Sequence, residues 1–409
     1  MGNGNDLVIV GAVRTPFSKF GGLLKDLHSS KIGEMVIREL VKRTGLNADE
    51  VDELYYGMCI QSEAALLYNV IGRQGLIHAG LSPETVSLTV DRACCSSLAC
   101  VQMGRRSILL DEASICMAIG AENMSNTPVV MNGHRWGTGI AKPVVVDHLN
   151  PIMYVDFNSL AGDAGECALE HGISREMQDE WALGSQLKYQ EAKKAEKFKI
   201  GEELFAIDVP QKRGEPQVLT EDEFPKPWTS MEKLAGLKPV YGSPTVTPGN
   251  SPGLDAGAAG MVITKRSTAE ARGFKILGII ETVASVAGNP DKIAEVPAFA
   301  IKKALTLSKL TLDQVDLIEI NEAFAAMPLV STRILSNGDD ATWQQLKDKT
   351  NQNGGAIAIG HPVGASGARI LMTAMYELRR RGGGSAAVAI CGGLAQGDAA
   401  IVRVDETCV

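Results

Sequence analysis

The sequence predicts an α/β protein with a mostly parallel sheet that helices cover on both faces. Short apolar runs such as LVIVGAV (7–13) and AAVAICG (386–392) are bounded by turn residues, as buried strands usually are. Amphipathic stretches such as IGEMVIRELVKRTG (32–45) lie between these runs, and Gly45 provides a C-terminal stop for that helix. Alternation of strands and helices favours parallel pairing, because each helix carries the chain back to the same end of the sheet.

Two pairs of similar segments indicate an internal duplication. GLNADEVDELYYG (45–57) resembles KLTLDQVDLIEIN (309–321), and SICMAIG (114–120) resembles SAAVAIC (385–391). Chance could produce either match alone, but the two occur in the same order and at similar offsets. A loop-rich, mixed-charge stretch interrupts the pattern between them. We therefore predict two related halves, 1–121 and 251–409, and an inserted loop domain at 122–250 that could cover a ligand.

The overall composition excludes several classes of protein. The 409 residues are 45% hydrophobic and 22% charged, as in a soluble globular protein of two or three packed units. The formal charge of -8 argues against nucleic acid as the main partner, although a local basic pocket could hold a small phosphorylated ligand. No apolar run is long enough to span a membrane, and the N-terminus lacks a signal-peptide layout. We therefore expect a cytoplasmic protein.

The eight cysteines are spread along the chain without paired CxxC motifs or a His-rich neighbour. This spacing predicts neither a disulfide scaffold nor a metal site. Most of the cysteines are expected to be small buried hydrophobes.

Cys94 follows a short predicted strand, SLTV (87–90), and stands where a helix begins. Unpaired backbone N–H groups at a helix N-terminus favour a thiolate, so a reactive Cys94 at this position is expected to have a lowered pKa. A buried cysteine in a helix of small residues is the alternative. This segment alone favours that alternative.

Three other segments could carry chemistry. His361 lies in QNGGAIAIGHPVGASGARI (352–370), where the density of glycine indicates a tight backbone path that presents the imidazole. Cys391 ends a predicted strand and is followed by Gly392 and Gly393, and Asn321 follows another strand in EINEAFAA (319–326). Structural alternatives are a strand cap for Cys391 and a helix N-terminus for Asn321.

Together with the opening IVGAVRTPFSKFGG, these segments resemble the thiolase family in order and spacing over almost the whole chain. The long block around His361 is the most specific part. The resemblance implies the thiolase fold, in which two similar βαβαβαββ halves form a five-layered αβαβα sandwich with an inserted loop domain. It also implies an acyltransferase that cleaves a 3-oxoacyl-CoA with coenzyme A, or runs the reverse Claisen condensation.

The resemblance assigns a role to each candidate residue. Cys94 would attack the thioester carbonyl and carry the acyl group, His361 would accept its proton, and Cys391 would act as the second acid/base. One oxyanion hole would consist of the His361 side chain and a water held by Asn321. The backbone N–H groups of Cys94 and Gly393 would form the other.

Coenzyme A is expected as a substrate, and no tightly bound cofactor is implied. Lys226 and Lys233 lie where the family contacts coenzyme A, although a solvated charged surface explains them equally well. Ser251 is a third candidate, because Pro252 occupies a position where relatives often carry a CoA-contacting serine. The resemblance further implies a homodimer or homotetramer.

The acyl pocket departs from the family pattern. The segment SLAGDAGECA (159–168) has Ser159 and Leu160 where short-chain relatives commonly carry His-Met. A bulky, branched or carboxylated 3-oxoacyl-CoA, for example of the benzoylsuccinyl type, is therefore an alternative substrate, and some such thiolases work with a small accessory subunit. Cys95, next to the nucleophile, is either a bystander or a site of oxidation.

Two rival functions remain. Decarboxylating 3-oxoacyl synthases need a further His or Asn in a matching motif, and we find no second His of that kind. A non-catalytic lipid-binding relative would usually have lost Cys94, His361 or Cys391, and all three are present.

Overall fold

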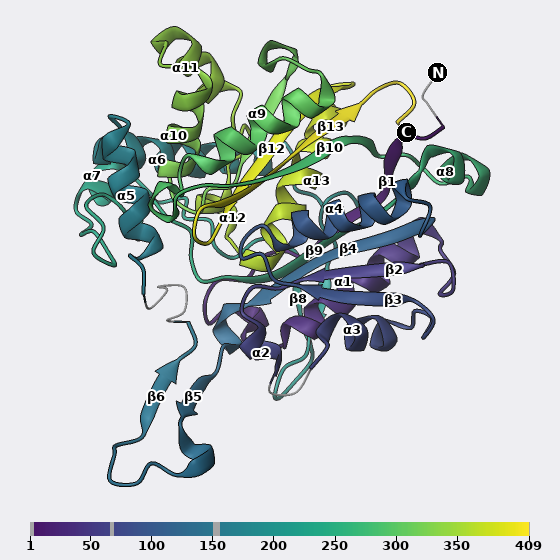
Figure 1. Ribbon diagram of the computed structural model, residues 1–409, viewed down its shortest axis with the longest axis horizontal. Helices are drawn as coiled ribbons and strands as arrows, with labels where there is room; N and C mark the ends of the chain where they lie inside the picture. The colour runs from purple at the N-terminus through teal and green to yellow at the C-terminus, as the bar shows by residue number, and fades with distance from the viewer. Residues whose placement is uncertain (1–3, 66–68, 150–155, 409) are drawn as a thin grey trace.

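The computed structural model describes residues 4–65, 69–149 and 156–408. The main strands are β1 (Leu7–Arg14), β2 (Glu53–Gly57), β3 (Val86–Val90), β4 (Ile115–Asn123), β9 (Ala256–Lys265), β10 (Gly278–Ala287), β11 (Leu317–Ile320), β12 (Gly384–Gly392) and β13 (Gln396–Val404). They form a continuous nine-stranded array in the order β11-β12-β13-β10-β1-β9-β4-β2-β3 (Figure 1).

This array consists of two similar halves that join where β1 pairs with β10. In the first half β2 lies parallel to β3 and β4, and β9 joins β4 to β1 in antiparallel pairing. In the second half β11 lies parallel to β12, and β13 joins β12 to β10. The duplication extends to single hydrogen bonds. Oδ2 of Asp52 accepts the backbone N–H of Ser114 at 2.8 Å, and Oδ2 of Asp316 accepts that of Ser385 at 2.8 Å.

The prediction of a mostly parallel sheet is wrong. Five of the pairings are antiparallel (β1–β10, β1–β9, β10–β13, β12–β13 and β4–β9), against three parallel pairings. Strand–helix alternation describes only the first strands of each half. The tight turn 393–395 joins β12 directly to β13, and without a helical crossover two consecutive strands pair antiparallel.

Three large buried clusters lie between the five layers of the predicted αβαβα sandwich. Val8 and Val10 of β1 belong to the cluster that contains α1, whereas Ile9 belongs to the cluster with the central helices. Neighbouring residues of one strand thus face different layers. The outer layers contain α1 (Ser29–Thr44) and α3 (Ile71–Ala79) on one side, and α9 (Val296–Ser308) and α10 (Ala326–Leu335) on the other. The central layer contains α4 (Ser96–Leu109) and α13 (Ser366–Arg380). Short helices α2 (Gln61–Ala65), α8 (Arg266–Arg272), α11 (Asp340–Asp348) and α12 (Ala356–Ile359) complete the two halves.

The segment between β4 and β9 contains the inserted elements. A hairpin of β5 (Val129–Asn132) and β6 (Val144–Asp147) projects from the body of the molecule (Figure 1). It is followed by α5 (Leu160–Glu170), α6 (Arg175–Lys194), α7 (Met231–Ala235) and a small pair, β7 (Ile207–Val209) and β8 (Gln217–Leu219). Helix α5 packs on α10 and α6 packs on α12, so these helices cover the second half. The domain limits at 121/122 and 250/251 stay a prediction, and the predicted ranges include residues 1–3, 66–68, 150–155 and 409, which lie outside the described residues.

A buried ion-pair cluster ties the insertion to the sheet. Arg14 at the end of β1 donates from Nε to Glu203 at 2.5 Å and from Nη1 to Asp222 at 2.7 Å. All three side chains are buried, and both carboxylates belong to the inserted segment. Tyr189 of α6 and Thr373 of α13 add hydrogen bonds to the same carboxylates. No helix in the described part of the chain is long and apolar enough to cross a membrane.

Candidate active site

Cys94 lies in the turn between β3 and α4 and is 9% exposed. The preceding residue, Ala93, has a φ of +49°, which is unusual and costly for a residue with a Cβ. The guanidinium of Arg92 donates to Asp398 at 3.1 Å and to Oε1 of Gln396 at 2.7 Å. The Cys94 turn is therefore fixed against the start of β13 in the other half.

The expected lowering of the Cys94 pKa is wrong. Burial raises the pKa of the Cys94 thiol well above its ordinary value, and negative charge on Cys391 or Glu122 would raise it further. Helix α4 begins only at Ser96, so Cys94 precedes its first turn. Desolvation of the thiolate outweighs the partial charge at the helix end. The resting group is a neutral thiol, which needs a base before it can attack a carbonyl.

His361 is held on both sides of its ring and by its backbone. Its N–H donates to Oδ2 of Asp255 at 2.7 Å, and Nδ1 lies 2.6 Å from Oγ of Ser366. The Ser366 hydroxyl gives its single hydrogen to the carbonyl of Pro362 at 2.9 Å. Nδ1 of His361 must therefore be the donor toward Ser366, which leaves a lone pair on Nε2. Burial, followed by the charge of Arg369, lowers the pKa of His361 to about 3, so the ring is neutral near pH 7.

Asn321 faces this lone pair. Its Nδ2 lies 3.4 Å from Nε2 of His361, and its Oδ1 accepts Nη2 of Arg369 at 3.2 Å. Because a guanidinium can only donate, Arg369 fixes which end of the amide carries the oxygen. The NH2 end of Asn321 therefore points to the imidazole.

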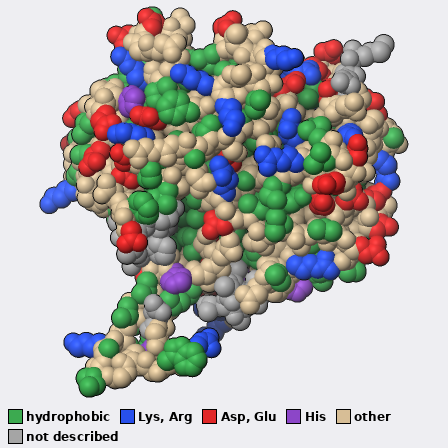
Figure 2. Space-filling view, in the orientation of Figure 1, with side chains coloured by type: hydrophobic (Ala, Val, Ile, Leu, Met, Phe, Trp, Pro, Cys, Tyr) green, Lys and Arg blue, Asp and Glu red, His purple; other side chains and the backbone are tan. Residues whose placement is uncertain are grey.

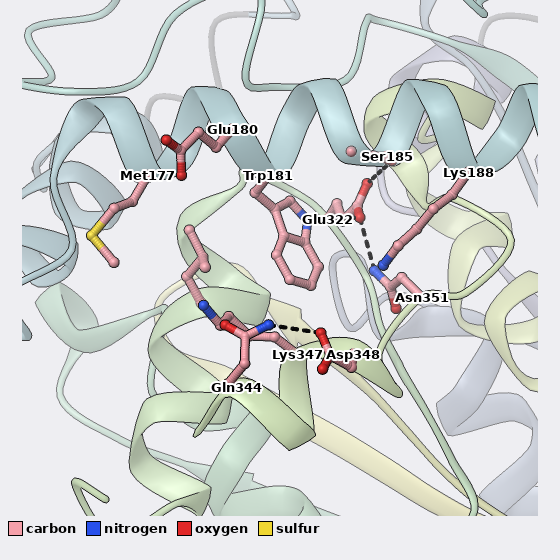
Figure 3. Close-up of a pocket in the computed structure, with 12 residues that line it drawn as sticks. Met177, Glu180, Trp181, Ser185, Lys188, Glu322, Gln344, Lys347, Asp348 and Asn351 are labelled. Carbon is pink, nitrogen blue, oxygen red and sulfur yellow. Dashed lines mark hydrogen bonds between the residues drawn. The ribbon is translucent and has the colours of Figure 1, made fainter. Parts of the chain in front are cut away.

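The residue after Asn321 anchors its loop to the insertion. Glu322 accepts Nε1 of Trp181 at 2.9 Å and Oγ of Ser185 at 2.8 Å from α6 (Figure 3). It also accepts Nδ2 of Asn351 at 2.9 Å and the backbone N–H of Ile357 at 3.0 Å. Helix α6 thus holds the backbone that positions Asn321.

Cys391 lies near the end of β12 and is 1% exposed, and burial raises its pKa to about 12. The turn that follows begins at Gly393, and its next residues, Leu394 and Ala395, both have positive φ angles of +56° and +52°. Backbone strain of this kind, here flanking both Cys94 and Cys391, concentrates at functional sites. Cys95 is fully buried and its Sγ lies 3.5 Å from the Ile390 carbonyl, so it packs between the two cysteine-bearing segments.

Cys94 and His361 occupy corresponding places in the two halves, each just before the central helix of its half. These helices meet at their N-termini, where Oγ of Ser97 accepts the N–H of Ala368 at 2.9 Å. Cys391 is near enough for its charge to raise the pKa of Cys94. His361 and Asn321 are therefore in contact, Cys94 lies near Cys391, and the two helices that follow Cys94 and His361 meet where the halves join.

Comparison with known families agrees with this geometry. Residues 7–267 match the model for the thiolase N-terminal domain, and residues 274–404 match that for the thiolase C-terminal domain. The chain belongs to the thiolase family. It is 37% identical to an acetyl-CoA acetyltransferase of Cupriavidus necator (97% of this chain, 99% of that one) and 36% identical to a beta-ketoadipyl-CoA thiolase of Acinetobacter baylyi (97% and 98%). The crystal structure of human mitochondrial 3-ketoacyl-CoA thiolase in complex with CoA superimposes with a TM-score of 0.88 at 33% identity, covering 98% of each chain.

The three residues predicted to contact coenzyme A differ in their contacts with the residues around His361. Lys226 is half-buried, with Nζ 4.4 Å from the centroid of the Phe224 ring, and its charge acts on Asp255, the residue that holds His361. Lys233 is exposed on α7 and donates to the carbonyl of Trp228 at 2.8 Å. Oγ of Ser251 donates to the carbonyl of Thr247 at 2.7 Å. Among these three residues, only Lys226 interacts with a residue that contacts His361, namely Asp255.

Sequence reasoning missed the residues that orient the thiolase centre. Ser366 and Arg369 lie within the quoted glycine-rich block, so that block already contained them. Asp255 and Glu122 had no local signal. Glu122 is buried and accepts backbone N–H groups of Cys59, Ile60 and Gly364 at 2.9 to 3.1 Å, and burial raises its pKa to about 8.

Proposed function

We propose that this thiolase carries its acyl group on Cys94, with Nε2 of His361 as the base and Cys391 as the second acid/base. The main support for this proposal is the hydrogen-bond chain from His361 through Ser366 to the Pro362 carbonyl. It places the ring proton of His361 on Nδ1 and leaves a basic lone pair on Nε2. A neutral thiol at Cys94 and a neutral imidazole form a pair that transfers a proton as the attack occurs.

In cleavage, Sγ of Cys94 attacks the 3-oxo carbon while its proton moves to Nε2 of His361. The bond between carbons 2 and 3 then breaks, and the carbanion of acetyl-CoA takes the proton of Cys391. The thiol of a second coenzyme A attacks the acyl-Cys94 thioester and gives its proton to the Cys391 thiolate. Cys94 leaves as a thiolate and recovers its proton from His361, so both cysteines return to thiols. Condensation is the reverse sequence.

Negative charge develops on the carbonyl oxygen in both half-reactions. The protonated Nε2 of His361, together with a water held by the amide of Asn321, supplies one set of donors in this proposal. The backbone N–H groups of Cys94 and Gly393 supply the other. Loss of one donor of this kind typically lowers the rate by about 10²–10³-fold.

Peptide mass spectrometry after brief incubation with acetyl-CoA tests the nucleophile. We expect one acetyl group on Cys94, none in Cys94→Ala, and full labelling in Cys408→Ser, which alters a cysteine far from the turn. A thiolase whose Cys94→Ala variant still turns over, or which takes the acetyl group on Cys95, would contradict the proposal. Complete absence of acylation and turnover would favour the non-catalytic lipid-binding alternative.

The acyl group is open to a direct test. We propose an ordinary 3-oxoacyl-CoA as substrate, in keeping with the relatives named acetyl-CoA acetyltransferase. The relatives named beta-ketoadipyl-CoA thiolase favour a carboxylated 3-oxoacyl-CoA as the second candidate. A thiolysis panel of acetoacetyl-CoA, longer linear, aryl and carboxylated 3-oxoacyl-CoAs decides between them. Turnover of bulky substrates only after a small accessory subunit is added would identify the specialised form.

Two exposed apolar features support the proposal of a homodimer or homotetramer. Strand β3 ends the described array, and its Val86 and Leu88 side chains are 64% and 48% exposed. A free strand edge of this kind readily pairs with a second chain. The projecting hairpin also carries apolar side chains far from the body (Figure 2): Val129, Met131, Trp136, Ile140, Val144 and Val145.

Light scattering with size-exclusion chromatography tests this assembly. We expect a mass of two or four chains for the wild type, and a lower mass for a Trp136→Ser, Ile140→Ser double variant if the hairpin joins dimers. A monomeric wild-type protein would refute the oligomer.

A further inference from the structure

Outside the active site, a cluster of three possible metal ligands joins α5 to the start of α9. Cys167 lies on α5, His171 stands one turn after Cys167 and directly follows the last residue of α5, and Glu295 directly precedes α9. One ligand atom from each residue lies within 4.8 Å of the other two. Nε2 of His171 is 2.9 Å from Oε1 of Glu295.

We propose that Cys167, His171 and Glu295 bind one divalent cation of the zinc type. Sulfur, imidazole nitrogen and carboxylate oxygen are the ligands that zinc prefers, and a water can occupy the fourth tetrahedral position. Zinc bonds of about 2.0–2.3 Å place neighbouring ligand atoms roughly 3.3–3.8 Å apart. The observed separations, from 2.9 Å to at most 4.8 Å, bracket this range, so small side-chain movements would complete the site.

The spacing along α5 favours joint binding. Residues four apart on a helix project from the same face, so Cys167 and His171 reach one point without backbone change. The Cys167 thiol is fully buried, whereas the His171 and Glu295 side chains are 25% and 20% exposed and open a path from solvent. Binding would release the thiol proton to solvent as the sulfur–metal bond forms.

The surroundings of the cluster are short of positive charge. Asp163, one turn before Cys167 on α5, is 3% exposed, and its Oδ1 atom is buried without a hydrogen-bond partner among the described residues. Oδ1 of Asp291, in the turn Pro290–Lys292 that packs on α5, also has no hydrogen-bond partner among the described residues, although the Asp291 side chain as a whole is 47% exposed. Lys292 is shared between Glu170 and Asp291. Buried carboxylate oxygens without partners are costly, and a nearby dication would offset that cost.

Metal binding to the full-length protein tests the proposal. After chelation and dialysis, the protein is titrated with Zn2+ and, separately, with Co2+, whose thiolate complexes absorb in the near ultraviolet. We expect about one equivalent of either metal per chain and a thiolate-to-cobalt charge-transfer band. Cys167→Ser and His171→Ala should each weaken binding at least about 100-fold, because each removes a direct ligand.

Control variants distinguish metal binding at this cluster from metal binding by the active-site thiols. Cys94→Ala and Cys408→Ser should keep both the stoichiometry and the band, and Zn2+ should raise the unfolding temperature of these variants but not that of His171→Ala. His171 is partly exposed, so we expect His171→Ala to fold. This variant therefore tests the site even if Cys167→Ser does not fold. The proposal is overturned if no metal is retained, or if the band disappears in Cys94→Ala and survives in His171→Ala.

Discussion

Nδ2 of Asn321 lies 3.4 Å from Nε2 of His361, and Nη2 of Arg369 donates a hydrogen bond to Oδ1 of the same amide at 3.2 Å. The separation of 3.4 Å is long for a hydrogen bond, so the contact is weak and its geometry depends on what holds the amide. Arg369 is fully buried, and its Nε and Nη1 atoms have no hydrogen-bond partner among the described residues. Its one hydrogen bond in the described chain goes to Asn321, and its Nη1 atom also lies 3.8 Å from Oε2 of the buried Glu319 carboxylate.

Arg369→Met should lower kcat by about 10²-fold with little change in KM, because the freed Asn321 amide can rotate away from His361. Loss of the guanidinium charge should also raise the pKa of His361, since that charge acts with burial to lower it. The pH profile of kcat/KM checks both effects. Arg369→Lys keeps the charge but not the planar fork, so we expect a low kcat with an unshifted pH limb. A purely structural role for Arg369 would leave the pH limb in place in both variants.

The buried neutral His361 should make the protein less stable in mild acid. The pKa of His361 is about 3 in the folded protein, against an ordinary value of 6.5. Between these two values the imidazole is protonated in the unfolded chain but neutral in the folded chain. The folded state therefore loses stability as the pH falls from 6.5 toward 3, by about 2 kcal/mol at pH 5. Urea unfolding of His361→Asn at pH 7.5 and pH 5 should show a pH dependence smaller by that amount.

His78→Asn is the matched control for this experiment, because His78 is exposed on α3. An equal pH dependence in the wild type and His361→Asn would show that His361 does not stay neutral when folded.

Lys226→Met should raise the KM for coenzyme A by about tenfold and leave kcat nearly unchanged, because the lost ammonium would bind a phosphate rather than the reacting atoms. Lys233→Met should raise the KM at most about fivefold, since the Lys233 ammonium is exposed and already donates to Trp228. Steady-state kinetics with varied coenzyme A measure both. A loss of kcat in Lys226→Met would instead show that the Lys226 charge matters for the chemical step, through Asp255 and His361.

Arg14→Met should destabilise the fold by about 3–5 kcal/mol, because it leaves the buried carboxylates of Glu203 and Asp222 without their cation. Chemical denaturation measures the loss. Arg38→Met is the control, since its pair with Glu34 lies at the surface and should matter by no more than about 1 kcal/mol. Equal effects in the two variants would mean that the Arg14 cluster does not fasten the insertion.

Local pattern in the sequence was enough for the elements and for the family. The run LVIVGAV is part of β1, and Gly45 ends α1 with a φ of +70°, as its position at the helix end predicted. The repeated Asp52 and Asp316 make equivalent hydrogen bonds in the two halves. Such features depend on residues near in sequence, so periodicity and spacing reveal them.

Only the tertiary structure decided pairing, burial and charge. It replaced the expected parallel sheet by a mixed one, because the partner of a strand depends on how the connection runs and not on the strand's own residues. It also reversed the expected pKa shift of Cys94, because desolvation comes from segments far along the chain. Cys167 and Glu295 lie on separate elements, and no spacing rule links them. The sequence by itself determined which residues this thiolase offers as candidates for acyl transfer, and folding decided which of them are neutral, which are held in place and which meet.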